Sequence, residues 1–190
     1  MSRRRENQAQ RGASLVELVV FIVVVGIGVA GVLAALNTAT RGSPDPMVQK
    51  QALAIAESLL EEVQLQPFTF CDPDDPAATT AASTAACAVV EGIGAEGAEN
   101  RYGAGGAFFD NVSDYSGYDS ATEGGLRDIS NTLIGLPGYR AVIGIVAADL
   151  GTIAAASGDA LLISVTVTGP ANTTVALQGY RARYAPRAVP

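Results

Sequence analysis

The chain has 190 residues, with 12 Lys or Arg, 19 Asp or Glu and no His, and its formal net charge is −7. The lack of His excludes a Ser-His-Asp triad and a His-ligated metal, and two Cys are too few for a four-thiolate zinc site. Net acidity with a single lysine, Lys50, argues against binding of a nucleic-acid backbone. Most enzyme classes are thereby removed, and we expect a protein that is not an enzyme.

A basic N-terminus precedes a long apolar run. Four arginines lie among the first twelve residues beside a single acid, which leaves eight bases against eighteen acids in the rest of the chain. Residues 18–36 carry no charge, and as a helix these nineteen residues span about 28 Å, close to the ~30 Å hydrocarbon core of a bilayer. This pattern predicts a membrane-spanning helix, and Arg3–Arg5 predict a cytoplasmic N-terminus.

The same run differs from an ordinary secretory signal, whose apolar core is about 7–15 residues long and is cleaved on its far side. Here the core is longer, and the sharp change in composition lies before it, at Gly12-Ala13. Glu17 lies at the membrane edge, where a carboxylate needs a partner. Cleavage after Gly12 would place the amine of Ala13 four residues before Glu17 on one helix face, where the two can pair.

The segment Gly12-Ala13-Ser14-Leu15-Val16-Glu17-Leu18, followed by an apolar helix, resembles the cleavage and methylation segment of type IV prepilins. The resemblance implies that a prepilin peptidase cleaves after Gly12 and methylates Ala13, and that Glu17 helps to dock the subunit into a filament. One departure is Ala13 itself, because the family commonly has Phe at this position, although small residues occur there in minor subunits.

The resemblance also implies the type IV pilin fold, an α+β fold in which a long N-terminal helix has a membrane-spanning half and an amphipathic half packed on a C-terminal antiparallel sheet. It divides the chain into a leader peptide, a transmembrane and assembly helix, an amphipathic helix, and a periplasmic or extracellular head. The leader covers 1–12 and the transmembrane helix 13–41, the amphipathic helix covers 42–66, and the head covers 67–190.

A second helix is predicted over about Pro46–Leu65. Ser43-Pro44-Asp45-Pro46 ends the first helix, because proline disfavours helix at its own position and at the one before it. Apolar residues then recur at three- and four-residue steps and predict one stripe that packs on a sheet. They are Val48, Ala52, Ile55, Ala56, Leu59 and Val63.

Cys71 and Cys87 flank a stretch rich in Pro, Ala and Thr, which predicts a loop with little core of its own. A head outside the cytoplasm permits a disulfide between them, and closure of this loop would stabilise the fold by about 3 kcal/mol in the chain-entropy model. Two free thiols, or pairing with another chain, are the alternatives.

Residues 92–125 are rich in Gly and acids and predict mostly loop. Asp110, Asp114, Asp119 and Glu123 could supply oxygens to a calcium ion, as loops of some pseudopilins do. Their spacing does not match the EF-hand loop, and solvated acids in a flexible loop are the interpretation we favour. Apart from this calcium, we expect no cofactor.

The last third predicts antiparallel strands. One covers Tyr139–Val146, and a second covers Ala160–Thr168, in which apolar residues alternate with Ser and Thr. A turn at 169–172 leads to a third strand that begins near Thr174. The larger side chains change phase after Gly179, which predicts a β-bulge at that glycine.

Scattered blocks resemble minor pilins of the mannose-sensitive haemagglutinin (MSHA) type, the D subunits in particular. Examples are Leu136-Pro137-Gly138-Tyr139 and Gly179-Tyr180-Arg181. The resemblance implies a minor pilin or pseudopilin of a type IV pilus, held in the bacterial inner membrane and then built into a filament, in initiation or at the tip. Its partners would be the prepilin peptidase, other pilins and the inner-membrane assembly platform. The alternative is a membrane-anchored periplasmic binding module that does not polymerise.

Overall fold

The structure is a computed structural model that describes residues 14–41, 45–103 and 107–189. Its contacts divide the chain into two compact units, Met1–Pro44 and Asp45–Pro190, and each is described by itself. From here on, "the head" means this second unit, which includes the predicted amphipathic helix as well as the predicted head at 67–190. Gly12 and Ala13, the two residues of the predicted cleavage site, lie outside the described residues.

The N-terminal unit contains one helix, α1 (Leu15–Arg41). Its stretch Leu15–Asn37 is long and apolar enough to cross a membrane, and none of that stretch is buried. Val, Ile and Leu side chains project on every side of it, including the large ones at Val20, Ile22 and Ile27. A helix that is apolar all round requires an apolar surrounding. The predicted helix is confirmed, and its composition is that of a transmembrane segment.

The head begins with α2 (Pro46–Leu65), whose bounds agree with the prediction from sequence. Asp45 caps the helix, because its Oδ1 accepts a hydrogen bond from the backbone N–H of Met47 at 2.9 Å. Pro46 occupies the first helical position, where its missing N–H leaves no intrahelical bond unmade. The helix ends where Gln66, which precedes Pro67, turns to extended backbone.

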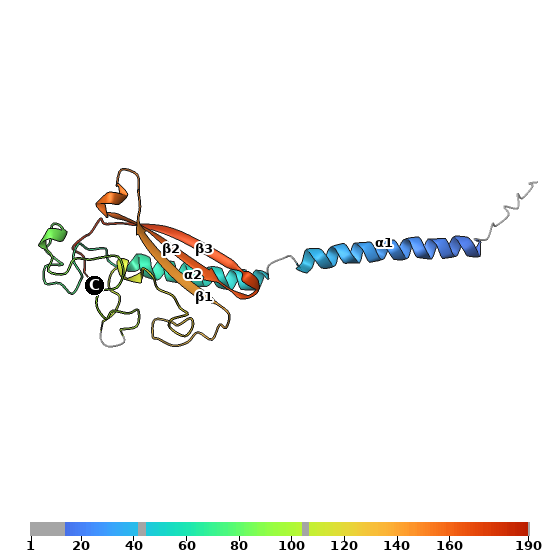
Figure 1. Ribbon diagram of the computed structural model, residues 1–190, viewed down its shortest axis with the longest axis horizontal. Coiled ribbons are helices and arrows are strands. Elements are labelled where there is room, and N and C mark those ends of the chain that lie inside the picture. The colour runs from blue at the N-terminus through green and yellow to red at the C-terminus, as the bar shows by residue number, and fades with distance from the viewer. Residues whose placement is uncertain (1–13, 42–44, 104–106, 190) are drawn as a thin grey trace, which may run out of the picture. The chain divides into compact units, whose positions relative to one another are not determined.

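Three antiparallel strands form the sheet in the order β1-β2-β3 (Figure 1). They are β1 (Arg140–Ala147), β2 (Ala160–Thr168) and β3 (Thr174–Ala182). The predicted bounds of β2 are confirmed, and β1 lies one residue further along the chain than expected. Helices and an antiparallel sheet segregated along the chain make this an α+β protein.

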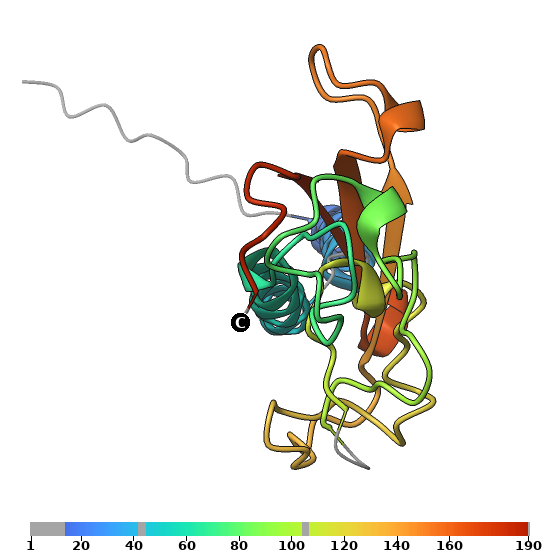
Figure 2. The ribbon, with the colours of Figure 1, turned by 90° about the vertical axis from the view of Figure 1, so that its left-hand side faces the viewer.

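The core lies between α2 and one face of the sheet, and α2 runs along that face next to β2 and β3 (Figures 1 and 2). Small and branched residues of the helix stripe pack against every second residue of the strands. A helix repeats its buried face about every 3.6 residues and a strand every 2 residues, and the two buried faces form one packed layer. The helix contributes Ala52, Ala56, Leu59 and Val63, and the strands contribute Ala141, Ile143, Ile145, Ile163, Val165 and Val167.

The predicted bulge at Gly179 is wrong. The pairing of β2 with β3 continues without a break from Thr168↔Thr174 to Ala160↔Ala182, with Ile163 opposite Gly179. Gly179 faces α2, and a Cβ there would lie 2.3 Å from Nε2 of Gln64 and 3.3 Å from Cδ1 of Leu60. The glycine therefore allows the helix to lie close to β3. Tyr180 points to the opposite, half-exposed face.

The long segment between α2 and β1 packs against the open edge of β1. Backbone N–H groups of Gly117 and Ser120 donate to the carbonyls of Ile143 and Ala141, and Ile143 donates to the carbonyl of Tyr118. Val112 and Tyr115 of the same segment are buried in the core. This part of the predicted loop is therefore fixed in place, and it positions the acidic side chains described next.

Candidate functional site

Glu17 is the only residue of the predicted processing and docking set that lies within the described residues. It lies in the first turn of α1, and the helix starts with a hydrogen bond of 3.1 Å from the N–H of Leu18 to the carbonyl of Ser14. A carboxylate in the first turn interacts favourably with the unpaired N–H groups of the helix N-terminus. Glu17 is exposed within its unit, so its carboxylate is available to a partner.

Cys71 and Cys87 are joined by a disulfide, with their Cα atoms 5.3 Å apart. Next to it, Cys71 pairs as a bridge with Val90, Asp72 N–H donates to the carbonyl of Val89, and Glu91 N–H donates to that of Phe70. The disulfide and this short ladder bring the acids after Cys71 and the acid Glu91 to one side of the head.

Reduction of the disulfide should lower the free energy of unfolding by about 3 kcal/mol, because the bond closes a loop of 16 residues in the unfolded chain. Urea unfolding of the full-length chain in detergent, with and without dithiothreitol, measures this difference. The Cys71→Ala/Cys87→Ala double variant should lose a similar amount and should not respond to dithiothreitol. Equal stability of the oxidised and reduced chains would contradict the prediction.

The four acids that were considered from sequence as calcium candidates, against the favoured interpretation of solvated acids, do not form one group among the described residues. Asp119 forms an ion pair with Arg140, whose guanidinium lowers the pKa of this carboxyl to about 2. The backbone carbonyl of Glu123 accepts a hydrogen bond from Nε of Arg127. Asp110 and Asp114 belong to two different acidic groups. Among the described residues, neither acidic group contains Asp119 or Glu123, so the four acids considered from sequence are not brought together as one group.

Within the described residues, two other groups of three carboxylates come together, and the oxygens of each group lie within 4.8 Å of one another. The first is Asp72, Asp74 and Asp110, and the second is Glu91, Glu96 and Asp114. Sequence reasoning missed Asp72, Asp74, Glu91 and Glu96. The acid run directly after Cys71 could have suggested the first two, once the disulfide was assumed.

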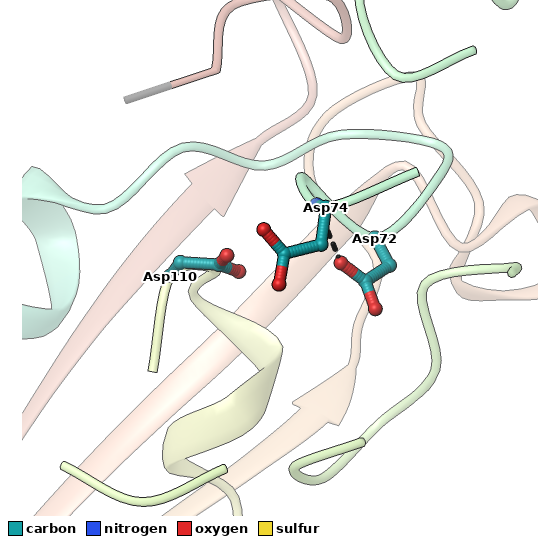
Figure 3. A group of neighbouring side chains, drawn as sticks. All are labelled: Asp72, Asp74 and Asp110. Atoms are coloured by element: carbon teal, nitrogen blue, oxygen red, sulfur yellow. Dashed lines mark hydrogen bonds between the residues drawn. The ribbon is translucent and has the colours of Figure 1, made fainter. Parts of the chain in front are cut away.

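The first group lies where the turn after Cys71 meets the start of the 110–115 segment (Figure 3). Oδ1 of Asp72 accepts the backbone N–H of Asp74 at 2.7 Å, so part of this group stabilises its own turn. Desolvation, and then the charge of Asp72, raise the pKa of Asp110 to about 6. Asp74 lies between the other two side chains (Figure 3). It is the exposed member of the group.

The second group is more deeply buried. Oδ2 of Asp114 accepts the backbone N–H groups of Asp110 at 2.9 Å and Asn111 at 2.7 Å, and Oε1 of Glu91 accepts the hydroxyl of Ser113 at 2.7 Å. Oε1 of Glu96 accepts the N–H of Gly92 at 2.9 Å. Each of the three carboxylates is thus held in place by a donor on one oxygen.

Burial and mutual repulsion disfavour the charged forms of this second group. Desolvation is the main cause that raises the pKa of Glu91 to about 9 and that of Asp114 to about 7. Glu99, whose Oε2 accepts the N–H of Glu96, has its pKa raised to about 7 by desolvation and by neighbouring acids. The neutral, protonated forms of these carboxyls are therefore favoured, and Glu91 and Asp114 also form a hydrogen bond with each other that raises the pKa of Glu91.

A buried ion pair ties α2 to the loops that carry these groups. Nε and Nη2 of Arg101 donate to the two oxygens of Glu62 at 2.6 and 2.5 Å, and the Arg101 side chain is 5% exposed. Arg101 also donates to the carbonyl of Arg127 at 2.9 Å, and the hydroxyl of Tyr115 donates to Glu62 at 3.0 Å. Burial lowers the pKa of Arg101, but Glu62 outweighs it and raises the pKa above its ordinary value.

Comparison with known proteins gives no match to a family model, a curated protein or a solved structure. Any function must therefore be argued from the residues themselves. Those residues are an exposed apolar helix with Glu17 in its first turn, and a disulfide-closed head with two groups of three acids, of which only Asp74 is fully exposed.

Proposed function

We propose that this chain is a minor subunit of a type IV pilus-like filament and acts as a structural protein, without enzymatic activity. The observation that carries the proposal is α1, an unburied apolar helix preceded in sequence by Gly12-Ala13 and with Glu17 in its first turn. A helix of this kind serves two successive surroundings, the lipid bilayer before assembly and the apolar helices of neighbouring subunits afterwards.

Processing creates the group that Glu17 needs. The prepilin peptidase would cut after Gly12, remove the arginines of residues 1–12 and methylate the new amine of Ala13. That amine and Glu17 carry opposite charges, and an unpaired ion beside hydrocarbon is costly, by about 2.5–3.5 kcal/mol at the centre of a bilayer and less at its edge. Pairing of one subunit's amine with the Glu17 of a neighbour would therefore set the axial position of each new subunit.

The head supports the same proposal at a coarser level. A helix laid along one face of an antiparallel meander is the arrangement expected of the pilin fold, and α2 with β1-β2-β3 fits it. Its partners would be other pilins and the inner-membrane assembly platform, and the chain would pass from the inner membrane to an extracellular pilus that serves cell adhesion. The scattered sequence blocks support an MSHA-type minor pilin, and we place it in initiation or at the tip.

The mature N-terminus tests the proposal directly. Mass spectrometry of chain purified from its own cells should find an N-methylated Ala13 as the first residue. A chain that begins only at Met1 or Ser2, with no trimmed form, would contradict the proposal and would favour a membrane-anchored binding module that does not polymerise.

Glu17→Ala should be processed normally but incorporated into filaments at least tenfold less than the natural chain. The reason is that the amine of a neighbouring subunit would then be left in apolar surroundings without a partner. Immunoblots of sheared filaments against whole cells measure the ratio. The matched control is Glu57→Ala, which removes an exposed acid from α2 and should leave incorporation unchanged. Equal incorporation of both variants would remove the docking role of Glu17.

A further inference from the structure

The backbone groups of the edge strand β3 alternate between two directions (Figure 1). Just before the strand, the carbonyl of Thr173 accepts the N–H of Gly169 at 2.8 Å. Just after it, the N–H of Arg183 donates to the carbonyl of Asp159 at 2.8 Å, in the same register. In an antiparallel pair, the residues that exchange hydrogen bonds with the neighbouring strand recur at every second position. The backbone groups of the residues in between therefore point outward, away from β2. They belong to Thr174, Ala176, Gln178, Tyr180 and Ala182.

The outer edge of β3 is open. The carbonyl of Ala182 accepts the N–H of Tyr184, but in the part of the chain that the structure describes no hydrogen bond engages the outward backbone groups of 174–180. The opposite edge of the sheet differs, because segment 117–120 bonds to β1. Natural proteins usually protect an edge strand with proline, charges or a bulge. Strand β3 has no proline, a single charge at Arg181 and continuous pairing with β2, so its edge is able to accept another strand.

We infer that this edge pairs with the same edge of a second copy of the chain, in an antiparallel arrangement centred on Leu177. Thr174 then lies opposite Tyr180 of the second copy. Ala176 lies opposite Gln178 of the second copy. Each of these pairs exchanges two hydrogen bonds, and the two-fold symmetry repeats both pairs, so every outward N–H and C=O of the four residues gains a partner. The two sheets join into one.

The side chains at this edge favour a second copy as the partner. Residues 174–180 carry no charge, so two chains of net charge −7 place no like charges opposite each other along the paired strands. Leu177, which is only half-buried against the core, meets its own counterpart at the two-fold axis. Val175, half-buried on the same face, lies opposite Gly179, where Leu60 of α2 approaches the strand. The pairing thus covers apolar surface that one copy alone leaves accessible to water.

Sedimentation equilibrium of the full-length chain in density-matched detergent tests the pairing. We expect an equilibrium of monomer and dimer, and Ala176→Pro should weaken the dimer at least tenfold. Proline at this position removes an outward N–H and leaves the hydrogen bonds to β2 intact, so the variant should keep the Tm of the natural chain to within about 3 °C.

The matched control is Ala154→Pro, at an exposed position whose φ of −80° already suits proline. This variant should dimerise like the natural chain. A natural chain that stays monomeric at every concentration would overturn the inference. Equal dimerisation of Ala176→Pro and the natural chain would overturn it too, because α1 or another surface would then join the copies.

A single introduced cysteine measures the register, since the two natural cysteines are joined to each other. Leu177→Cys should form a disulfide between two chains on mild oxidation. The Cα atoms of a non-hydrogen-bonded antiparallel pair lie about 4.5 Å apart, which is within the range of about 4.4–6.8 Å that a disulfide spans. Val175→Cys is the matched control, because its two copies lie about 14 Å apart across the axis and should not cross-link.

Cross-linking of Val175→Cys as readily as Leu177→Cys would overturn the proposed register, and so would a dimer in which Leu177→Cys does not cross-link. Neither measurement involves Gly12 or Glu17. Failure of the strand pairing can therefore be told apart from failure of the filament function, and the inference does not depend on that function.

Discussion

Glu62→Ala should destabilise the head by about 3–5 kcal/mol, because it leaves the guanidinium of Arg101 buried without its carboxylate. Arg101 cannot escape the penalty by deprotonation at neutral pH, since guanidinium groups in proteins stay charged. The hydroxyl of Tyr115, which donates to Glu62 at 3.0 Å, loses its acceptor at the same time. In a domain with about 5–15 kcal/mol of total stability, this loss is a large share.

Thermal unfolding of the full-length chain in detergent, followed by circular dichroism, measures the effect, and Tm should fall by about 10–20 °C. The matched control is Glu61→Ala at the next position of α2, which is exposed and should change stability by no more than about 0.5 kcal/mol. The double variant Glu62→Leu/Arg101→Met should recover much of the loss, because it leaves no charge unpaired. Equal Tm values for the two single variants would show that the ion pair does not stabilise the head.

Gly12→Val should abolish trimming of the chain, so that only the form with residues 1–12 accumulates in the membrane. This prediction rests on the proposed function. A glycine before the cut lets the peptidase approach the peptide bond closely, whereas valine adds a stiff, branched side chain beside the scissile carbonyl. Without the cut there is no amine at Ala13 to pair with Glu17, so incorporation into filaments should be lost as well.

Immunoblots that resolve the full-length and trimmed chains, with mass spectrometry of the N-terminus, measure the outcome. The matched control is Gly28→Val within α1, where a Cβ would meet no other atom within 4 Å and an apolar residue suits the lipid. This control should be inserted and trimmed like the natural chain. Trimming of Gly12→Val at the natural level would show that Gly12 is not the cleavage residue.

The helices were predictable because the signals that define them are local. Helix α2 begins at Pro46, directly after the capping acid Asp45, and it ends before Pro67. Apolar residues at three- and four-residue steps determine which face of the helix is buried. Strand β2 was predictable for the same reason, because Ile163, Val165 and Val167 alternate with Ser and Thr and all three are buried.

The interpretation of Gly179 failed because its cause is not local. The large residues after it, Tyr180 and Tyr184, suggested a change of phase, but both remain well exposed and the strand runs on in register. What decides this position is the approach of Leu60 and Gln64 from a helix more than a hundred residues earlier. A sequence pattern read along one strand contains no information about that contact.

By itself, the sequence determined an apolar helix that can span a membrane, an amphipathic helix after it and an antiparallel sheet, because hydropathy period and proline position act over a few residues. Only the tertiary structure decided which acids meet. Glu91 and Asp114 are brought together by a disulfide, a short ladder and one hydrogen bond between loops, while Asp119 is drawn away to Arg140. Proximity between loops depends on the path of the whole chain, and spacing along the sequence does not specify that path.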